Sequence, residues 1–437
     1  MRRSTGSSCS TLRGAYHDPM SDPAPQNRCP VPHGDRRRTV PPGEPAAPRV
    51  EEVDGVWHVR SLPLVRQVLR EADATVQAGF SAETARQGLT GDHPPVLYAD
   101  GPEHRRQRTA TARFFTPATV SRRYRDLMEE RADELVERIR RDGGAELSAI
   151  TLRYSVEVAA QVVGLTDSDV DGMARRLERF FATAPAREED TGGLRGRVRG
   201  LLDAIRPTWA MGLFHLGDVR PAIAARRRQP REDVVSHLIA EGYTDREILV
   251  ECLTYAAAGM VTTREFIAVA VWHLLDDDAL RQQYLDADEP ARHAILHEIL
   301  RLEPVVGHLY RRTTQELVLE DGSERHEVPA GALLDLYVRQ ANADERSLGE
   351  DARQLCPERS RPKGVRPEVM SFGDGAHRCP GGFLAVQETD VFLQRLLRLP
   401  LELAHPPRVR WVDLIAAYEV RDVVLRMRRD APVRPVP

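Results

Sequence analysis

The sequence has few cysteines and no long apolar run, and each shortage excludes a class of protein. Its five cysteines among 437 residues form no Cys-x-x-Cys pair and no regular framework, which argues against a disulfide scaffold and favours a reducing compartment. No stretch reaches the roughly 18–20 apolar residues that cross a bilayer. The basic N-terminus is followed by no apolar core of the kind found in signal peptides. We therefore predict a cytoplasmic protein without a membrane segment.

Lysine is almost absent as well, and Lys363 is the only one. The 62 basic and 66 acidic side chains nevertheless nearly balance, giving a formal net charge of -4. This balance argues against a nucleic-acid partner. Hydrophobic residues make up 41% of the chain, which is enough to bury a sizeable core.

The chain divides into a short polar leader and one long remainder. Residues 1–45 are rich in Pro, Gly, Ser and Arg without periodicity, and we predict that they form a disordered leader. Residues 46–432 are predicted to form a single domain. An Asp-Gly turn signal within 53–59 indicates a β-hairpin, helical patterns dominate 103–300, and strand patterns return within 316–338. The fold class is thus mainly α with small β-sheets.

The most informative segment is Ser371–Ala385, which reads Ser-Phe-Gly-Asp-Gly-Ala-His-Arg-Cys-Pro-Gly-Gly-Phe-Leu-Ala. It places Cys379 after a glycine-rich loop and before an amphipathic helix. Helix N-termini carry unpaired N–H groups and the positive end of the dipole, so they stabilise a thiolate. Gly373 permits unusual dihedrals, and Gly381 allows a flat group to approach the backbone. A lone cysteine near a helix start is usually a small hydrophobe, but these neighbours favour a metal ligand.

This segment resembles, position for position, the haem-ligand pattern Phe-Gly-x-Gly-x-His-x-Cys-x-Gly-x-x-Leu-Ala of the cytochrome P450 family. The matching residues are Phe372, Gly373, Gly375, His377, Cys379, Gly381, Leu384 and Ala385. The resemblance spans roughly residues 50–430. It implies the P450 fold, a triangular helical prism with haem between a long distal helix and the helix after the cysteine loop. It also implies haem b, with the Cys379 thiolate as the axial ligand of the iron.

A second resemblance concerns a buried polar network. Glu298 and Arg301 are three residues apart on one predicted helical face. A Glu-x-x-Arg pair alone is usually a solvated surface pair, but beside the cysteine motif it resembles the family's buried Glu/Arg pair. Arg359, in Cys-Pro-Glu-Arg, resembles the third member. We expect the three to form a charge-assisted network that holds the proximal side together, which is a structural role.

Haem carries two propionates, which require cations. The segment 100–108 resembles a family helix in which a His and an Arg four residues later face these groups. A strand arginine and a loop histidine complete the set. The residues expected to bind the propionates are His104, Arg108, Arg311 and His377. Arg312 is the alternative register for the strand arginine. The family often has a further His three residues before the motif's Phe, where this chain has Val369.

The distal side departs from the family pattern Ala/Gly-Gly-x-Asp/Glu-Thr-Thr. Ala258 and Gly259 match the small residues that leave room for O2 and water. Thr262 matches the alcohol that bonds water and steers protons during oxygen activation. Val261 stands where the pattern has an acid, which normally gates proton entry from bulk water. Glu265, three residues after Thr262, is the alternative acid.

The resemblance implies a monooxygenase that oxidises a small organic substrate, typically a secondary metabolite, with O2 and two electrons. Substrate contacts are expected in 77–98 and in 168–228, which resembles a mobile lid. The chain carries no dinucleotide fingerprint, so the electrons are expected from NAD(P)H through ferredoxin reductase and ferredoxin. Val261 keeps oxidative coupling, desaturation or nitration open. A catalytically silent scaffold is the alternative from another class, against which the intact Cys379 argues.

Overall fold

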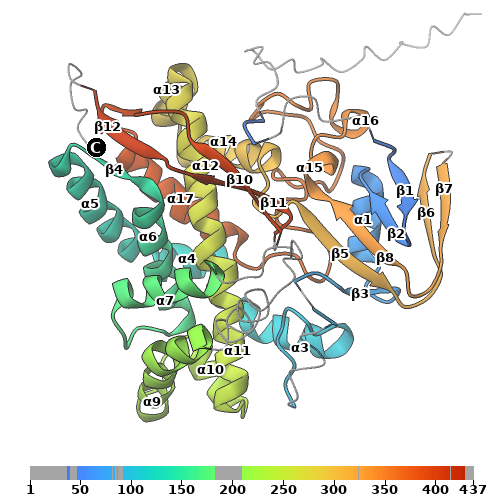
Figure 1. Cartoon of the computed structure of the whole chain (residues 1–437), viewed down its shortest axis with the longest axis horizontal. Coiled ribbons are helices and arrows are strands. Elements are labelled where there is room, and N and C mark those ends of the chain that lie inside the picture. The colour runs from blue at the N-terminus through green and yellow to red at the C-terminus, as the bar shows by residue number, and fades with distance from the viewer. Residues whose placement is uncertain are drawn as a thin grey trace, which may run out of the picture.

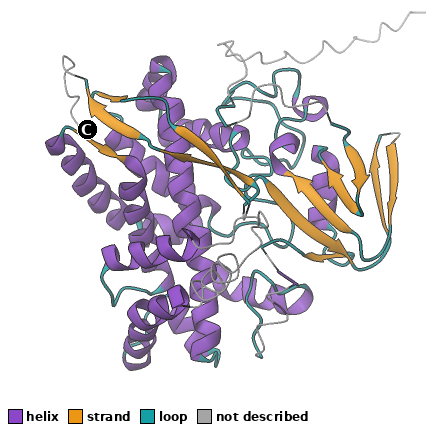
Figure 2. Ribbon diagram, viewed as in Figure 1, coloured by secondary structure: helices purple, strands orange, loops and turns teal. Residues whose placement is uncertain are grey.

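The computed structural model describes residues 37–39, 47–80, 82–83, 86, 92–182, 209–322, 324–413 and 415–428. In these ranges most of the helices gather on one side of the molecule, and the largest β-sheet lies on the other (Figures 1 and 2). The mainly α architecture with small sheets that the sequence predicts is therefore confirmed. Much of 168–228 and part of 77–98, where substrate contacts are expected, lie outside the described residues.

The described ranges contain two short π-helical segments as well as α-helices. The α-helices are α1 (Leu62–Arg70), α3 (Gly101–Ala112), α4 (Pro117–Arg123), α5 (Arg125–Asp142), α6 (Leu147–Val163), α7 (Val170–Ala182), α9 (Arg220–Arg228), α10 (Val234–Ala240), α11 (Asp245–Ala256), α12 (Thr262–Asp276), α13 (Asp278–Asp286), α14 (Glu289–Leu302), α15 (Val338–Ala341), α16 (Glu345–Leu348) and α17 (Gly382–Leu396). The π-helical segments are η1 (His215–Val219) and η2 (Ala257–Val261).

Within the described ranges, the strands pair into one five-stranded sheet and three smaller ones. They are β1 (Val50–Val53), β2 (Val56–Val59), β3 (Thr75–Gln77), β4 (Gly144–Glu146), β5 (His308–Thr313), β6 (Leu317–Asp321), β7 (Glu324–Val328), β8 (Leu333–Tyr337), β9 (Leu401–Leu403), β10 (Arg408–Val412), β11 (Ala417–Arg421) and β12 (Val424–Met427). The largest sheet has the order β1–β2–β8–β5–β3. The smaller sheets are β4–β12–β9, β6–β7 and β10–β11.

The five-stranded sheet positions one of the predicted site residues. The predicted hairpin joins β1 to β2 through Asp54 and Gly55, whose φ angles are 51° and 78°, as a two-residue hairpin turn requires. Strand β5 lies between β8 and β3. In the β3–β5 register, Arg311 is opposite Gln77, and this pairing holds the arginine at the edge that faces α3.

Two hydrophobic cores stabilise the fold. The larger lies among the helices and includes residues of α5, α6, α12 and α17. The smaller lies between α1 and the five-stranded sheet, where Leu64 and Val68 are fully buried. Burying one such aliphatic side chain contributes about 1.5–3 kcal/mol. In the described part of the chain, no helix combines the length and the apolar character that a bilayer span requires.

A long helical rod runs through the middle of the molecule as α11, η2 and α12 (Figure 1). It begins with a capping box in which Thr244 and Glu247 exchange hydrogen bonds, as the Thr-x-x-Glu spacing predicts. The π-helical turn η2 interrupts it at Ala257–Val261. Such turns insert one residue into an α-helix and frequently occur at functional sites.

Residues 37–39 pack on the domain although the sequence predicts a disordered leader up to residue 45. Thr39 is only 5% exposed, and its hydroxyl donates to the carboxylate of Glu303, directly after α14. The backbone N–H of Arg38 also donates to Glu303. Arg339 donates to the Thr39 hydroxyl at 2.8 Å, and His273 lies 3.3 Å from the Glu303 carboxylate. Residues 1–36 and 40–45 of the predicted leader lie outside the described residues.

Candidate functional site

The cysteine loop is a tight turn that seats Cys379 just before α17. The N–H of Cys379 donates to the carbonyl of Phe372 at 2.8 Å, closing the loop. Gly373 and Gly375 have φ angles of +70° and +65°, a region that L side chains rarely adopt. A Cβ at Gly375 would lie 2.0 Å from the carbonyl oxygen of Leu69. This glycine is therefore required both by its backbone and by its contact with α1.

The electrostatics of Cys379 suit a thiolate that has a cation bound to it. Burial raises the pKa of the thiol, while the N–H of Gly381 and the guanidinium groups of Arg108 and Arg378 favour the ionised form. The helix N-terminus alone, which the sequence suggested, does not outweigh this desolvation. A coordinated metal deprotonates a thiol outright, so ligation is the state that these surroundings fit.

The structure brings Glu298, Arg301 and Arg359 together as the sequence predicts. Arg301 binds Glu298 through two parallel hydrogen bonds of 2.7 and 2.8 Å, and both side chains are at most 1% exposed. Arg359 approaches the same carboxylate at 3.6 Å. Bidentate Arg–carboxylate pairs are the stronger kind of ion pair.

This network also anchors the chain that leads to the cysteine loop. Arg301 donates to the carbonyls of Asn342, Ala352 and Gln354, at 2.5 to 2.8 Å. The N–H of Cys356 donates to Glu298 at 2.9 Å. The buried pair thereby satisfies backbone groups of a segment without regular structure, which would otherwise be costly to bury.

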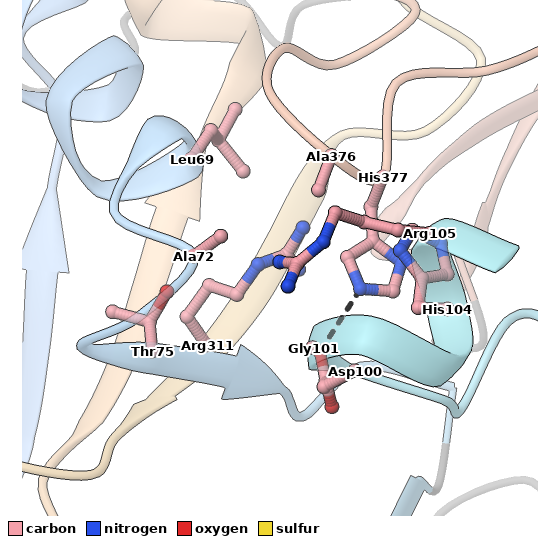
Figure 3. A pocket seen from close by; sticks show the side chains of 10 residues that line it. All are labelled: Leu69, Ala72, Thr75, Asp100, Gly101, His104, Arg105, Arg311, Ala376 and His377. Atoms are coloured by element: carbon pink, nitrogen blue, oxygen red, sulfur yellow. Dashed lines mark hydrogen bonds and ion pairs between the residues drawn. The ribbon is translucent and has the colours of Figure 1, made fainter.

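Three of the four residues expected at the propionates, His104, Arg311 and His377, line a small pocket between α3, β5 and the cysteine loop (Figure 3). His104 and His377 stack with their ring centroids 3.9 Å apart. Arg311 reaches across from β5 and is only 4% exposed. It donates to the side chain of Gln77 and to the carbonyl of Tyr310.

Arg108 joins the same group from the next turn of α3. Its guanidinium donates to the carbonyl of Arg378, directly before Cys379. Arg312, the alternative register, instead pairs with Glu83 at 2.5 Å on the exposed side of β5. The structure therefore selects Arg311.

This cluster concentrates buried basic side chains with little negative charge. Desolvation lowers the pKa of Arg311 to about 10 and that of His104 to about 4, where repulsion from His377 and Arg108 adds to the effect. Desolvation likewise lowers the pKa of Arg108. Asp100 is the carboxylate in the pocket lining, and it already binds His377 at 3.0 Å and Arg86 at 2.7 Å. A group with two further negative charges fits this cluster, as haem propionates would.

On the distal rod, Ala258 and Thr262 share a hydrogen bond and a partly open face. Thr262 donates its hydroxyl to the carbonyl of Ala258, across the π turn. Ala258 is exposed, whereas Met260 and Thr263, on the opposite face, are buried. A Cβ on Gly259 would lie 3.5 Å from the Cβ of Ala159, an ordinary contact. The Gly259 position therefore faces α6, and on the open face of the rod it is the small side chain of Ala258 that leaves space.

Neither of the two positions considered for the distal acid supplies a free carboxylate to Thr262. Val261 is half-buried and carries no ionisable group. Glu265 is 5% exposed and is bound to Arg264 at 2.7 Å and to Arg421 of β11 at 2.8 Å. The interpretation of Glu265 as a replacement acid is therefore unsupported, because its carboxylate is committed to these two ion pairs.

Two buried carboxyls were missed by reasoning from sequence. Glu388 in α17 has its pKa raised by burial to about 8, and its Oε1 has no hydrogen-bond partner in the described residues. Glu251 in α11 has its pKa raised by burial to about 7. In the sequence, the one sign of such a carboxyl is a charged residue inside an apolar helix. That sign does not separate unpaired from paired carboxyls, because Asp390, two residues after Glu388, pairs with Arg292 at 2.8 Å.

Comparisons with known proteins point to one family. The family model described as Cytochrome P450 matches residues 290–402. Nocardicin C N-oxygenase of Nocardia uniformis subsp. tsuyamanensis is 32% identical over 370 residues, covering 81% of this chain and 85% of the relative. The chain belongs to the cytochrome P450 family. A second relative, the mycinamicin IV hydroxylase/epoxidase of Micromonospora griseorubida, is 28% identical over 392 residues, covering 87% of this chain and 91% of the relative.

The solved structures agree with the P450 fold. The crystal structure of the hydroxylase HmtN matches with a TM-score of 0.69 at 23% identity, covering 89% of this chain and 95% of that one. As a P450 monooxygenase, this protein is an oxidoreductase of a family that binds haem iron through a cysteine thiolate and uses O2. The basic cluster and the cysteine loop fit that cofactor.

Proposed function

We propose that Cys379 ligates the haem iron and that this P450 oxygenates a small organic secondary metabolite. The observation that best supports this proposal is the cluster of buried basic side chains beside the cysteine loop. His104, Arg311 and His377 line one pocket, and Arg108 lies one turn further along α3. In the described lining Asp100 is the carboxylate, and it is already paired with His377 and Arg86, so two propionates would complete the group. When bound, the haem supplies the centre at which O2 is activated.

The surrounding residues hold the cysteine loop and the proximal chain in place. Phe372, Gly373 and Gly381 hold the turn in which the Cys379 sulfur is presented. The network of Glu298, Arg301 and Arg359 keeps the proximal chain in place. Substitution in that network is expected to prevent haem incorporation more than to slow chemistry.

On the distal side, Thr262 is the group that holds a proton-carrying water. Its hydroxyl is anchored on the Ala258 carbonyl, which leaves an oxygen lone pair to accept from water. Ala258 provides the space, and Val261 supplies no acid. Water and Thr262 then carry the protons without a carboxylate at the usual position.

A non-hydroxylating outcome is the second candidate, and a specific observation favours it. Because Glu265 is bound by Arg264 and Arg421, both positions considered for the distal acid are unable to gate protons. Oxidative coupling, desaturation and nitration place different demands on proton supply. The relatives' names include hydroxylase, epoxidase and N-oxygenase, which supports oxygen insertion as the first choice.

Electrons are proposed to come from NAD(P)H through a ferredoxin reductase and a ferredoxin. Lys363 and Arg366 are exposed on the chain leading to the cysteine loop, and an acidic carrier would meet complementary charge there. A solved P450 of the same fold, P450BioI, is in complex with an acyl carrier protein to which hexadec-9Z-enoic acid is ligated. A carrier-bound substrate is thus a case to include in a substrate screen.

The experiment that tests the assignment is the spectrum of the reduced protein with CO. We expect the absorption band of thiolate-ligated haem, and we expect Cys379→Ser to lose it while Cys356→Ser keeps it. Absence of the band from the wild-type protein overturns the proposal. A screen of candidate secondary metabolites for a shift of the haem spectrum then identifies the substrate class.

A further inference from the structure

The segment 92–98 is held on the distal rod by two carboxylates that the reaction does not use. Glu247 accepts a hydrogen bond from the N–H of His93 at 3.0 Å. Glu251, one helical turn later, accepts from the N–H of Val96 at 2.7 Å. Residues four apart lie on the same face of a helix, so both carboxylates of α11 accept hydrogen bonds from the same stretch of chain.

This stretch bridges two parts of the site. At one end it contacts α11, seven residues before Ala258 and therefore about 10 Å along the rod from it. At the other end it leads into Asp100, which binds His377 of the cysteine loop at 3.0 Å. Gln107 of α3 also holds it, by donating to the carbonyl of Pro94 at 2.9 Å.

The two carboxylates differ in their surroundings. Glu247 is exposed enough to be solvated, and it also belongs to the capping box of α11. Glu251 is 3% exposed, and its Oε2 has no hydrogen-bond partner in the described part of the chain. Burial raises the pKa of Glu251 to about 7, and the Val96 N–H offsets only part of that rise.

Among the described residues, no cation compensates Glu251 from the elements around it. On its own helix, Cys252 and Tyr255 have raised pKa values, which burial and the charge of Glu251 both favour. Tyr243, whose pKa is raised to about 12, stacks on His93 with centroids 4.0 Å apart.

The charged groups of α3 and of the turn before α11 are engaged elsewhere or lie outside the contact. On α3, Glu103 and Arg106 pair with each other at 2.9 Å, and Arg108 is turned to the carbonyl of Arg378. Glu241 precedes Tyr243 on the surface. Within the described ranges, the Val96 N–H is therefore the one group that supports the ionised form of Glu251.

We propose that Glu251 is a protonation-dependent catch that holds the 92–98 segment on the distal rod and controls entry to the distal face of the haem. The segment is closed when Glu251 is protonated and buried. Ionisation favours release, because a carboxylate is more stable in water than in a dry site with one donor. The entry role rests on the haem placement proposed above, whereas the catch itself does not.

The direction with pH follows from linkage. The closed state binds the proton up to a pKa of about 7, and a solvated glutamate only to 4.5. Closure is therefore fully favoured below about pH 4.5 and is lost progressively as the pH rises to about 7. That difference of about 2.5 pH units corresponds to at most about a 300-fold change in the opening equilibrium.

Hydrogen–deuterium exchange of the full-length haem-loaded protein tests the catch. We expect the protection factors of the His93 and Val96 amides, corrected for intrinsic rates, to fall at least tenfold between pH 5.5 and 8. Glu251→Gln should keep them high and independent of pH. Glu388→Gln, which removes another buried carboxyl from α17, is the matched control and should behave as wild type at these amides. A flat wild-type profile overturns the proposal without any variant, and so does a Glu251→Gln profile that follows the wild type.

The entry role has its own readout. Binding of n-butyl isocyanide, an uncharged iron ligand, should become faster as the pH rises in the wild-type protein and should stay slow in Glu251→Gln. Equal pH dependence in both proteins overturns the entry role. A missing thiolate–haem band would instead defeat the haem assignment, while the exchange experiment reports on Glu251 in either case.

Discussion

The imidazole of His104 on α3 stacks on that of His377 in the cysteine loop, with the ring centroids 3.9 Å apart. Residues 273 positions apart in the chain thus share one contact, and Arg311 of β5 reaches the same pocket (Figure 3). The guanidinium of Arg311 is buried here in advance of the anion that it is proposed to bind. Such preorganisation costs stability in the free protein and favours the complex.

Replacing Arg311 should separate these two effects. We expect Arg311→Met to release haem at least tenfold faster, because a propionate loses its buried cation. The haem-free variant should melt a few degrees higher than haem-free wild type, because desolvation already lowers the pKa of Arg311 to about 10. Haem transfer to apomyoglobin and calorimetry measure the two quantities.

Arg312→Met is the matched control for that experiment. Arg312 is the next residue of β5, but it is exposed and pairs with Glu83. Surface pairs contribute about 0–1 kcal/mol, so neither haem release nor melting should change appreciably. Equal effects of the two substitutions would contradict the assignment of Arg311.

Breaking the buried network should be far costlier than breaking a surface pair of the same spacing. Arg301→Met leaves Glu298 charged, buried and without its bidentate partner, and removing one member of such a pair costs about 3–5 kcal/mol. Arg140→Met breaks the exposed i,i+3 pair with Glu137 and should cost at most about 1 kcal/mol. Urea unfolding and the haem content of purified protein provide the comparison. Similar losses in both variants would argue against the network.

Glu388 predicts a specific dependence of stability on pH. Its pKa is about 8 in the folded protein and 4.5 when solvated, so the folded state retains a proton that the unfolded state has lost. Its contribution to stability is fully present below about pH 4.5 and is lost as the pH rises to about 8. Glu388→Gln should remove this part of the decline, seen as a smaller difference between melting temperatures at pH 5.5 and pH 8. An unchanged difference would show that Glu388 is ionised in the folded state.

Val261 predicts inefficient use of electrons. We expect Val261→Asp to decrease the peroxide released per NADPH consumed, measured with surrogate ferredoxin and reductase, because an acid beside Thr262 restores gated proton entry. Thr262→Ala should increase that ratio. Val261→Asn is the control of similar shape without an ionisable group. If Asp and Asn give the same ratio as wild type, proton gating at this position is unimportant.

The N-terminal contact predicts that residues before the domain stabilise it. Thr39→Val removes a hydroxyl that serves both Glu303 and Arg339 and leaves a buried carboxylate short of a donor. Such a loss costs about 1–3 kcal/mol, which urea unfolding detects. A chain beginning at residue 46 should lose at least as much. Full stability of that shorter chain would show that residues 37–39 contribute nothing.

Local patterns could be predicted where short-range chemistry decides them. The Asp54-Gly55 turn was confirmed, and the Thr244–Glu247 capping box forms as its residue spacing indicates, because the hydrogen bonds of both close within four residues. The grouping of Glu298 with Arg301 was predictable for the same reason, since i and i+3 share a helical face. Arg359 and the propionate cations followed only from the family resemblance.

The sequence by itself determined the cysteine loop, the helical class and the family, because glycine positions, capping residues and periodicity act over a few bonds. Only the tertiary structure decided which charges are paired. Glu265 is neutralised by Arg421, 156 residues away, whereas Glu251 and Glu388 meet no cation at all in the described chain. A carboxyl's protonation depends on the dielectric and on the charges around it, and those are set by segments that the chain brings together only on folding.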